Sequence, residues 1–196
     1  MKSLPQKNQN SITQKGFDFS NDKNPITIDV RKAARKYILN FLKAAESSGG
    51  KQLNHDWLQK GPNAGERAIG PYAFMPSTVQ DLVSKDKNLK SKYGKVLNLS
   101  YGDFEQSEIE DFFKKNPKIN DDLANHYIDK IVAGTSARTA EEISQAWLYG
   151  VKGYNKQQQN ASSNNPTGIP QGDEVTAARN ARAADIVKKQ QGKERI

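Results

Sequence analysis

One glutamate, Glu46, stands where a side chain could act as a proton-donating catalyst. It lies at the end of a predicted helix, with Leu42, Ala44 and Ala45 behind it and a Gly-rich turn after it. Apolar surroundings and the negative end of a helix dipole both disfavour an ionised carboxylate, so we expect the pKa of Glu46 to be raised. A carboxylic acid that stays protonated near neutral pH can protonate the leaving oxygen of a glycosidic bond.

A hydrolase would also need a second carboxylate to direct water at the sugar carbon. Asp56 and Glu66 follow Glu46 in the same loop region and are the candidates for that role. Each could instead brace the loop or lie on the surface. The choice between one carboxyl and two is therefore open at this point.

Other classes of chemistry find little support in the residues. The chain contains no Cys and only two His, so it offers no thiol nucleophile, no thiolate metal site and no His-rich metal centre. Neither His lies near a Gly-x-Ser-x-Gly nucleophile elbow, and the Gly-rich stretch lacks the Lys-Ser/Thr end of a phosphate-binding loop. We expect neither a metal nor another cofactor.

Three blocks of the sequence, at 46–47, 70–78 and 146–154, together resemble the soluble lytic transglycosylases, a family with a goose-type lysozyme-like domain. Glu46-Ser47 forms the first block, and 70–78, Gly-Pro-Tyr-Ala-Phe-Met-Pro-Ser-Thr, forms the second. The segment 146–150, Ala-Trp-Leu-Tyr-Gly, lies where the family has Ala-Tyr-Asn-Ala-Gly, and Tyr154 follows it. The likeness covers roughly residues 30–154 and is to the murein-degrading enzymes carried in phage virions.

The resemblance implies cleavage of the β-1,4 bond between N-acetylmuramic acid and N-acetylglucosamine in peptidoglycan. Glu46 would protonate the bridging oxygen and then accept the proton of the muramoyl C6 hydroxyl as a 1,6-anhydro ring closes. The acetamido group of the substrate would stabilise the oxocarbenium-like centre. Ser47 would either orient Glu46 or simply end the helix. The residues expected to contact the glycan strand are Ser47, Tyr72, Met75, Tyr149 and Tyr154.

Two positions depart from the family pattern. Ala73 stands where the family has a Gln that lines the sugar groove, and Leu148 stands where it has an Asn. The side-chain amides that would bind N-acetyl groups are missing at both positions. An alternative therefore stays open, in which the chain is a structural virion or injection-channel protein with a degenerate lysozyme-like domain.

The elements that must position these residues are mainly helical. Apolar residues recur at helical spacing between Pro25 and Ala45, whereas residues 46–75 are Gly-rich and aperiodic. Further helix starts are indicated at Pro76, at the capping boxes Ser107/Glu110 and Thr139/Glu142, and at Asn120, with helix ends at Gly134 and Gly150. We expect a mainly α, lysozyme-like helical domain with a short irregular or hairpin excursion.

Composition divides the chain into four parts: a polar basic N-terminal arm (1–24), the lysozyme-like transglycosylase domain (25–154), a flexible linker (155–174) and a C-terminal tail helix (175–196). The tail helix carries a thin stripe made of Val175, Ala178, Ala181, Ala184 and Val187. Such a stripe predicts a helix that docks on a partner or frays.

The net charge of +8 belongs to the two ends of the chain. Residues 1–36 carry +5 and residues 151–196 carry +4, whereas residues 37–150 carry −1. We expect the basic arms to bind other virion or envelope-crossing proteins. Nucleic acid is a weaker alternative, because no aromatic residues are interleaved with the Lys residues.

The sequence also predicts where the protein works. No stretch approaches the roughly 20 apolar residues that cross a bilayer, so we expect no membrane span. The first residues are basic and polar without the apolar core of a secretory signal. We expect a protein made in the cytoplasm and carried to the periplasm and cell wall as a virion component, either a tail or an internal ejection protein.

Overall fold

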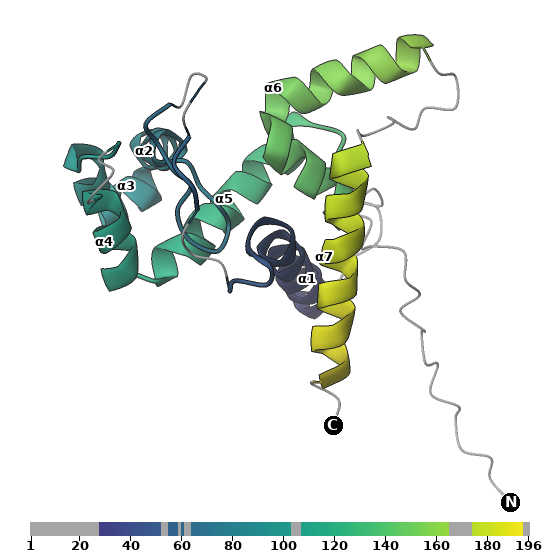
Figure 1. The fold of residues 1–196 in the computed structure, drawn as a ribbon, viewed down its shortest axis with the longest axis horizontal. Helices are drawn as coiled ribbons and strands as arrows, with labels where there is room; N and C mark the ends of the chain where they lie inside the picture. Colours follow the sequence, from purple (N-terminus) through teal and green to yellow (C-terminus); the bar gives the residue numbers. More distant parts are fainter. Residues whose placement is uncertain are drawn as a thin grey trace, which may run out of the picture.

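The computed structural model describes residues 28–51, 55–58, 60, 64–102, 107–164 and 174–193. These residues form helices and no strand. In chain order (Figure 1) the elements are α1 (Ile28–Ser47), α2 (Pro76–Lys85), α3 (Lys87–Tyr93), the 3₁₀ helix η1 (Gly94–Asn98), α4 (Glu108–Lys115), α5 (Lys118–Gly134), α6 (Ala140–Asn164) and α7 (Glu174–Lys193). The mainly helical class is confirmed, whereas the lysozyme-like arrangement stays a prediction.

Several helix ends lie where capping residues predicted them. The backbone N–H of Glu142 donates to Thr139 Oγ1 at 3.2 Å, and the N–H of Thr139 donates to Glu142 Oε2 at 3.0 Å. This reciprocal pair begins α6, because it satisfies donors that have no partner within the helix. Ser107 caps α4 by accepting from the N–H of Glu110 at 3.5 Å, while the carboxylate of Glu110 pairs with Arg67 instead, and α2 begins at Pro76 as expected.

Two features of the helical pattern differ from the prediction. α5 begins at Lys118 rather than after Asn120, whose side-chain amide donates to Pro117 O at 3.1 Å. α3 was not predicted, and it forms because Asp86 Oδ1 accepts from the N–H of Leu89 at 2.8 Å. A short polar helix of this kind carries too few apolar residues to give a periodic signal.

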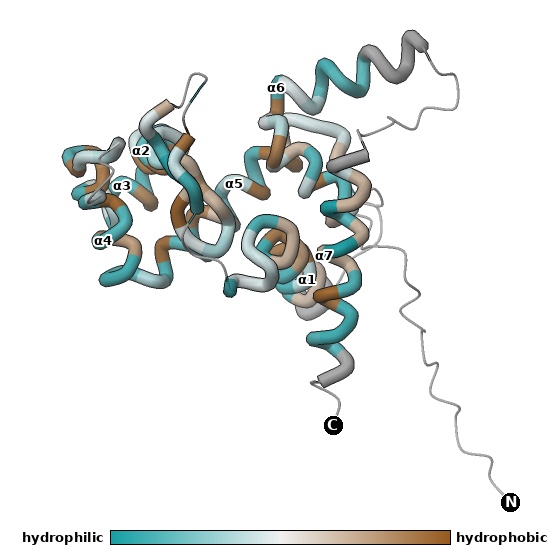
Figure 2. Tube along the Cα trace, viewed as in Figure 1, coloured by the Kyte–Doolittle hydropathy of each residue, from teal (hydrophilic) through white to brown (hydrophobic). Residues whose placement is uncertain are grey.

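One apolar core joins these helices. Its fully buried large side chains include Phe41, Leu42, Leu82, Ile109, Leu123, Ile128, Ile131 and Ile143. α2, α3 and α4 lie toward one end of α5, and α1, α6 and α7 lie toward the other (Figure 1). Brown, hydrophobic stretches of α1, α5 and the first part of α6 face one another (Figure 2). Within the described ranges, no helix is both long and apolar enough to span a membrane.

The predicted hairpin between α1 and α2 is not confirmed. The described residues there contain one isolated bridge, between Ile69 and Phe74, and otherwise irregular chain. A four-residue turn connects the two bridge residues, with the N–H of Ala73 donating to Gly70 O at 3.1 Å. The described part of the excursion therefore contains this tight turn and a second backbone pairing, in which the N–H of Leu58 donates to Glu66 O at 2.8 Å and the N–H of Gly65 donates to Leu58 O at 2.9 Å.

α6 bends at Gly150 and then continues. Gly150 has φ 69° and ψ 165°, outside the helical region, and helical structure resumes beyond it up to Asn164. The predicted linker (155–174) thus differs from the structure over its first part, and residues 165–173 lie outside the described residues. The segment after the bend projects from the body (Figure 1) and is largely hydrophilic where it is coloured (Figure 2).

α7 lies along α1 (Figure 1) instead of forming a free tail. Its buried residues are Thr176, Ala183 and Val187. The predicted stripe is wrong at Ala178 and Ala181, which are exposed, whereas Val187 is buried and Ala184 packs partly against the core. The N-terminal arm (1–24) lies outside the described residues.

Candidate active site

Glu46 lies in the last turn of α1, and its side chain is largely shielded from solvent. Its side chain is 13% exposed, and its carboxylate forms an ion pair and hydrogen bond with Arg179 of α7. Burial raises the pKa of Glu46 above its ordinary value, against the opposing influence of Arg179 and, more weakly, of His55. The raised pKa predicted from the apolar neighbours is confirmed in direction. The arginine partner was not predicted.

Ser47 is fully buried and joins the end of α1 to the 70–78 segment. Its hydroxyl lies 2.7 Å from Pro71 O and 3.0 Å from Lys43 O, and it accepts from the N–H of Gly50 at 3.0 Å. These contacts are with backbone groups, so Ser47 fixes the chain around Glu46, and its burial corrects the expected contact of Ser47 with the glycan strand. His55 supports the same segment, because its Nε2 lies 3.2 Å from Gly70 O. The first two blocks of the resemblance therefore meet in space.

Tyr72 belongs to the core, which corrects its expected contact with the glycan. The residue is 0% exposed, and its hydroxyl donates to Asp121 Oδ1 at 2.7 Å. Burial, together with Asp121, raises the pKa of the Tyr72 hydroxyl. Its ring packs near Phe74 and Trp147, and the indole Nε1 of Trp147 donates to Tyr72 O at 3.3 Å. An aromatic side chain enclosed in this way presents no face to a sugar.

Tyr154 is corrected for the same reason, since it is 1% exposed. Its hydroxyl makes side-chain hydrogen bonds with Ser136 and Gln158, and burial raises its pKa. Helical spacing alone could not separate a core tyrosine from a substrate-facing one, because both recur on the same helix face.

Two of the expected glycan contacts remain at least partly exposed. Met75 is half-buried and immediately precedes α2, next to the turn that Ser47 holds. Tyr149 is half-buried on α6, and its hydroxyl lies 3.2 Å from Thr176 Oγ1 of α7. Leu148, at the position of the family's Asn, is exposed. Their contact with a glycan stays a prediction.

The two candidates for a second carboxylate differ sharply. Glu66 is buried, and its Oε2 accepts from Ser77 Oγ at 3.0 Å and from the N–H of Ser77 at 3.4 Å. It therefore satisfies the first turn of α2, where helical N–H groups lack partners. Asp56 is exposed. Its role in directing water stays a prediction.

Arg179 is the residue that sequence analysis missed. Its Nη1 donates to Ser144 Oγ at 2.7 Å, and Ser144 Oγ in turn donates to Asn180 Oδ1 at 3.1 Å. The signal was present in the spacing of Thr176, Asn180, Ala183 and Val187, which share one helix face. This face was not recognised because two of its residues, Thr176 and Asn180, are polar, and amphipathic patterns are normally sought among apolar residues.

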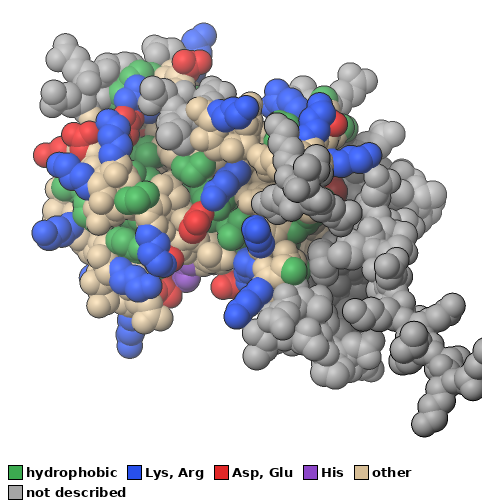
Figure 3. Space-filling model, turned by 90° about the horizontal axis from the view of Figure 1, so that it is seen from below, with side chains coloured by type: hydrophobic (Ala, Val, Ile, Leu, Met, Phe, Trp, Pro, Cys, Tyr) green, Lys and Arg blue, Asp and Glu red, His purple; other side chains and the backbone are tan. Residues whose placement is uncertain are grey.

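Charged residues elsewhere mainly connect helices. Arg67 lies over the ring of Trp57, at 4.7 Å from its centroid, and pairs with Glu110 of α4. Over the face drawn in Figure 3, Lys and Arg side chains are dispersed among Asp and Glu rather than gathered in one patch. No group of three or more potential metal ligands occurs in the part of the chain that the structure describes. Comparison with known proteins gives no match to a family model, to a curated protein or to a solved structure.

Proposed function

We propose that this chain is a peptidoglycan lytic transglycosylase that uses Glu46 as its general acid and base. The observation that carries the proposal is the contact of Ser47 with Pro71 O, which joins two blocks far apart in sequence beside a shielded carboxyl of raised pKa. Apolar shielding is how proteins keep a carboxylic acid protonated for donation to a leaving oxygen. The resemblance to phage virion enzymes suggests that this activity acts on the cell wall that a particle must cross.

The proposed reaction needs one carboxyl. Protonated Glu46 donates to the oxygen between N-acetylmuramic acid and N-acetylglucosamine, and the bond to the muramoyl C1 breaks. The resulting carboxylate accepts the proton of the muramoyl C6 hydroxyl, whose oxygen bonds to C1. Glu46 is then protonated again, and the products are a free N-acetylglucosamine end and a 1,6-anhydromuramoyl end. The bonding of Glu66 to Ser77 supports this scheme over hydrolysis, because it gives that carboxylate a structural task.

A structural virion or channel protein is the second candidate. The observation that favours it is the pairing of Glu46 with Arg179, which covers the carboxylate and opposes the rise in its pKa that burial causes. A permanently covered Glu46 could not donate a proton to a glycosidic oxygen. The two candidates therefore differ in whether this contact opens.

Product analysis on purified murein sacculi tests the proposal. We expect the full chain to release anhydromuropeptides, Glu46→Gln to release none, and Asp56→Asn to match the wild type. Mass spectrometry distinguishes anhydro products from hydrated ones, which would mean a hydrolase. Unchanged release by Glu46→Gln would refute the role of Glu46.

A further inference from the structure

The described structure holds Glu46 in a state that its proposed role cannot use. Arg179 from α7 occupies the carboxylate, and the side chains of the two residues are only 13% and 11% exposed. A general acid must lie within hydrogen-bond distance of the oxygen that it protonates, and the guanidinium of Arg179 occupies that position on Glu46. A glycosidic oxygen also cannot reach a carboxylate that is covered by a helix. Either Glu46 is inert or α7 must leave.

We propose that α7 is an intramolecular latch that keeps Glu46 inactive until the helix undocks from α1. This inference rests on the proposed function, since it concerns the same carboxyl. The proposal rests on the position of Arg179, whose guanidinium donates to Glu46 through Nη2 and to Ser144 through Nη1. Arg179 thus links the end of α1 to α6 and covers the carboxylate of Glu46.

The rest of α7 is built to cover the same place. Tyr149, an expected glycan contact, has its hydroxyl 3.2 Å from Thr176 Oγ1 at the start of α7. Near the other end, Gln190 and Ile186 lie against Gly49, three residues after Glu46. α7 therefore contacts the candidate site at its acid, at one expected sugar contact and at the turn between α1 and the loop.

The side chains that α7 buries are of a kind that allows the helix to undock. Its wholly buried residues are Thr176, Ala183 and Val187, whose side chains are small, and much of the remaining helix is exposed. The large buried side chains of the core, such as Phe41 and Ile128, come from other helices. Helices gain most of their stability from burying an apolar face, and α7 contributes Ala183, Val187 and, in part, Ala184 and Ile186 to the core. Undocking α7 therefore leaves the largest core residues in place.

The test separates α7 from Glu46 by substitutions in the full chain. Val187→Asp puts a charge into the contact with α1, and Arg179→Gln removes the ion pair. Ala181→Asp makes the same charge change as Val187→Asp on the exposed face of α7 and is the matched control. We expect the first two variants to release anhydromuropeptides about tenfold faster than the wild type, within the usual range of coupling between sites. Ala181→Asp should leave the rate unchanged.

Amide hydrogen exchange gives a readout that does not depend on activity. Val187→Asp should speed exchange along α7 while exchange in α5 stays slow, which also shows that the core is folded. Faster exchange in α7 without a higher rate of murein cleavage overturns the latch and leaves the proposed function standing, provided that the wild type cleaves. A lower rate also overturns it, because α7 then belongs to the productive site.

Two remaining outcomes are equally decisive. If α7 stays protected in the double variant Arg179→Gln/Val187→Asp, it does not undock and the latch is wrong. If α7 is released but neither the wild type nor any released variant cleaves murein, the proposed function fails and the latch fails with it.

Discussion

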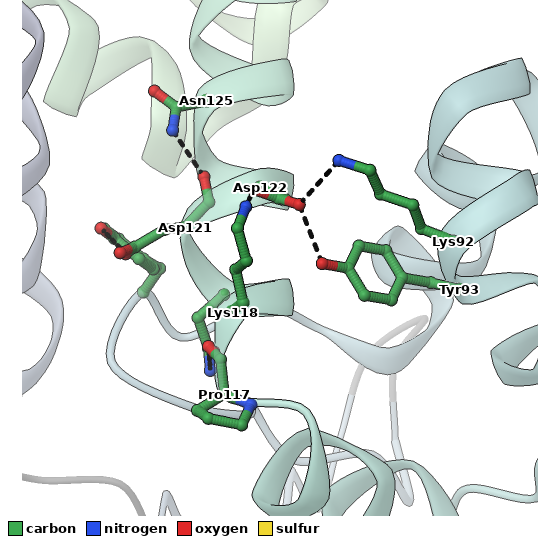
Figure 4. Close-up of polar contacts among 9 residues, drawn as sticks. Lys92, Tyr93, Pro117, Lys118, Asp121, Asp122 and Asn125 are labelled. Carbon is green, nitrogen blue, oxygen red and sulfur yellow. Dashed lines mark hydrogen bonds and ion pairs between the residues drawn. The ribbon is translucent and has the colours of Figure 1, made fainter.

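The carboxylates at the start of α5 and the carboxylate at the end of α1 are held in different ways. Asp122 accepts from the hydroxyl of Tyr93 at 2.8 Å, from Lys118 at 2.5 Å and from Lys92 at 3.3 Å (Figure 4). Glu46, in contrast, depends on a single cation, Arg179, that comes from the last helix of the chain. Several partners keep a carboxylate bound even when one is lost, whereas a single partner makes the contact an all-or-none event.

The neighbouring residue Asp121 extends this comparison. Its side chain points away from Asp122 (Figure 4), accepts from the hydroxyl of Tyr72 and pairs with Lys43 of α1. Two adjacent residues thus connect α5 to α3 on one side and to α1 and the 70–78 segment on the other. This cluster braces the body of the protein, whereas the Glu46 contact joins the body to α7. The first arrangement stabilises the fold, whereas the second is the one to which the proposed function assigns a reactive carboxyl.

The largest expected effect is on activity. In the Val187→Asp background, Glu46→Gln should lower the rate of anhydromuropeptide release by about 10²–10⁴-fold, the usual contribution of general acid–base catalysis. Asp122→Asn makes the same isosteric change in the other cluster and should keep the activity of the folded protein. Muropeptide release from sacculi at 25 °C measures both. Equal losses in the two variants would break the distinction between reactive and structural carboxylates.

The next largest effect is on stability, and here the variant in the Asp122 cluster should show the change. Asp122→Asn should lower the free energy of unfolding by about 1–3 kcal/mol, because charge-assisted hydrogen bonds are lost and the hydroxyl of the buried Tyr93 keeps a weaker acceptor. Urea denaturation followed by circular dichroism measures it. Lys85→Ala removes only an exposed pair with Asp81 and should change the stability by no more than about 0.5 kcal/mol. If Lys85→Ala lowered the stability as much as Asp122→Asn does, the number of hydrogen-bond partners of a charged group would not determine its contribution to stability.

The smallest effect is a difference in pH dependence. Burial alone would raise the pKa of Asp122, but hydrogen bonds from Lys118, Tyr93 and Lys92 outweigh it and lower the pKa. Its stabilising contribution is therefore present above the ordinary pKa of an aspartate and is lost as the pH falls through the lowered value. Burial raises the pKa of Glu46, so its contribution is present at low pH and is lost as the pH rises through the raised value.

Denaturation curves across acid and neutral pH check these opposite signs. The stability deficit of Asp122→Asn relative to the wild type should shrink on acidification. Glu46→Gln should gain stability relative to the wild type as the pH rises from about 4 toward neutrality. Parallel curves for the two variants would contradict the opposite directions of the two pKa shifts.

Local signals in the sequence predicted the ends of helices well. Thr139 and Glu142 begin α6 through backbone contacts within one turn, so neighbouring residues decide the outcome. Ser107 caps α4 within one turn as well, and Pro76 begins α2 because its fixed φ suits the first helical position. Gly150 was also identified, but its positive φ bends the chain and helical structure resumes after it. A glycine indicates an irregular backbone position, but it does not distinguish the end of a helix from a bend within one.

The candidate site was predicted only in part, because its remaining contacts are distant in sequence. Apolar residues in the same helix predicted a raised pKa for Glu46, and burial does raise it. Its pairing with Arg179 joins α1 to α7 and cannot be read from local periodicity. Tyr72 was misassigned because its acceptor, Asp121, lies on another helix. Long-range polar partners decide which aromatic residues are enclosed, and a single sequence does not display them.

The turn after α1 sets how closely α7 can approach. A β-carbon at Gly49 would lie 3.0 Å from Gln190 Nε2 and 3.5 Å from Ile186 Cγ2, and the residue has φ 80°. The positive φ strains any larger residue at position 49, and the nearest atom of α7 there is the movable end of an exposed side chain. In relatives of this chain that keep this turn, we expect glycine at position 49 whichever residue stands at position 190. A larger residue at position 49 would indicate that the turn, and with it the approach of α7 to α1, has changed.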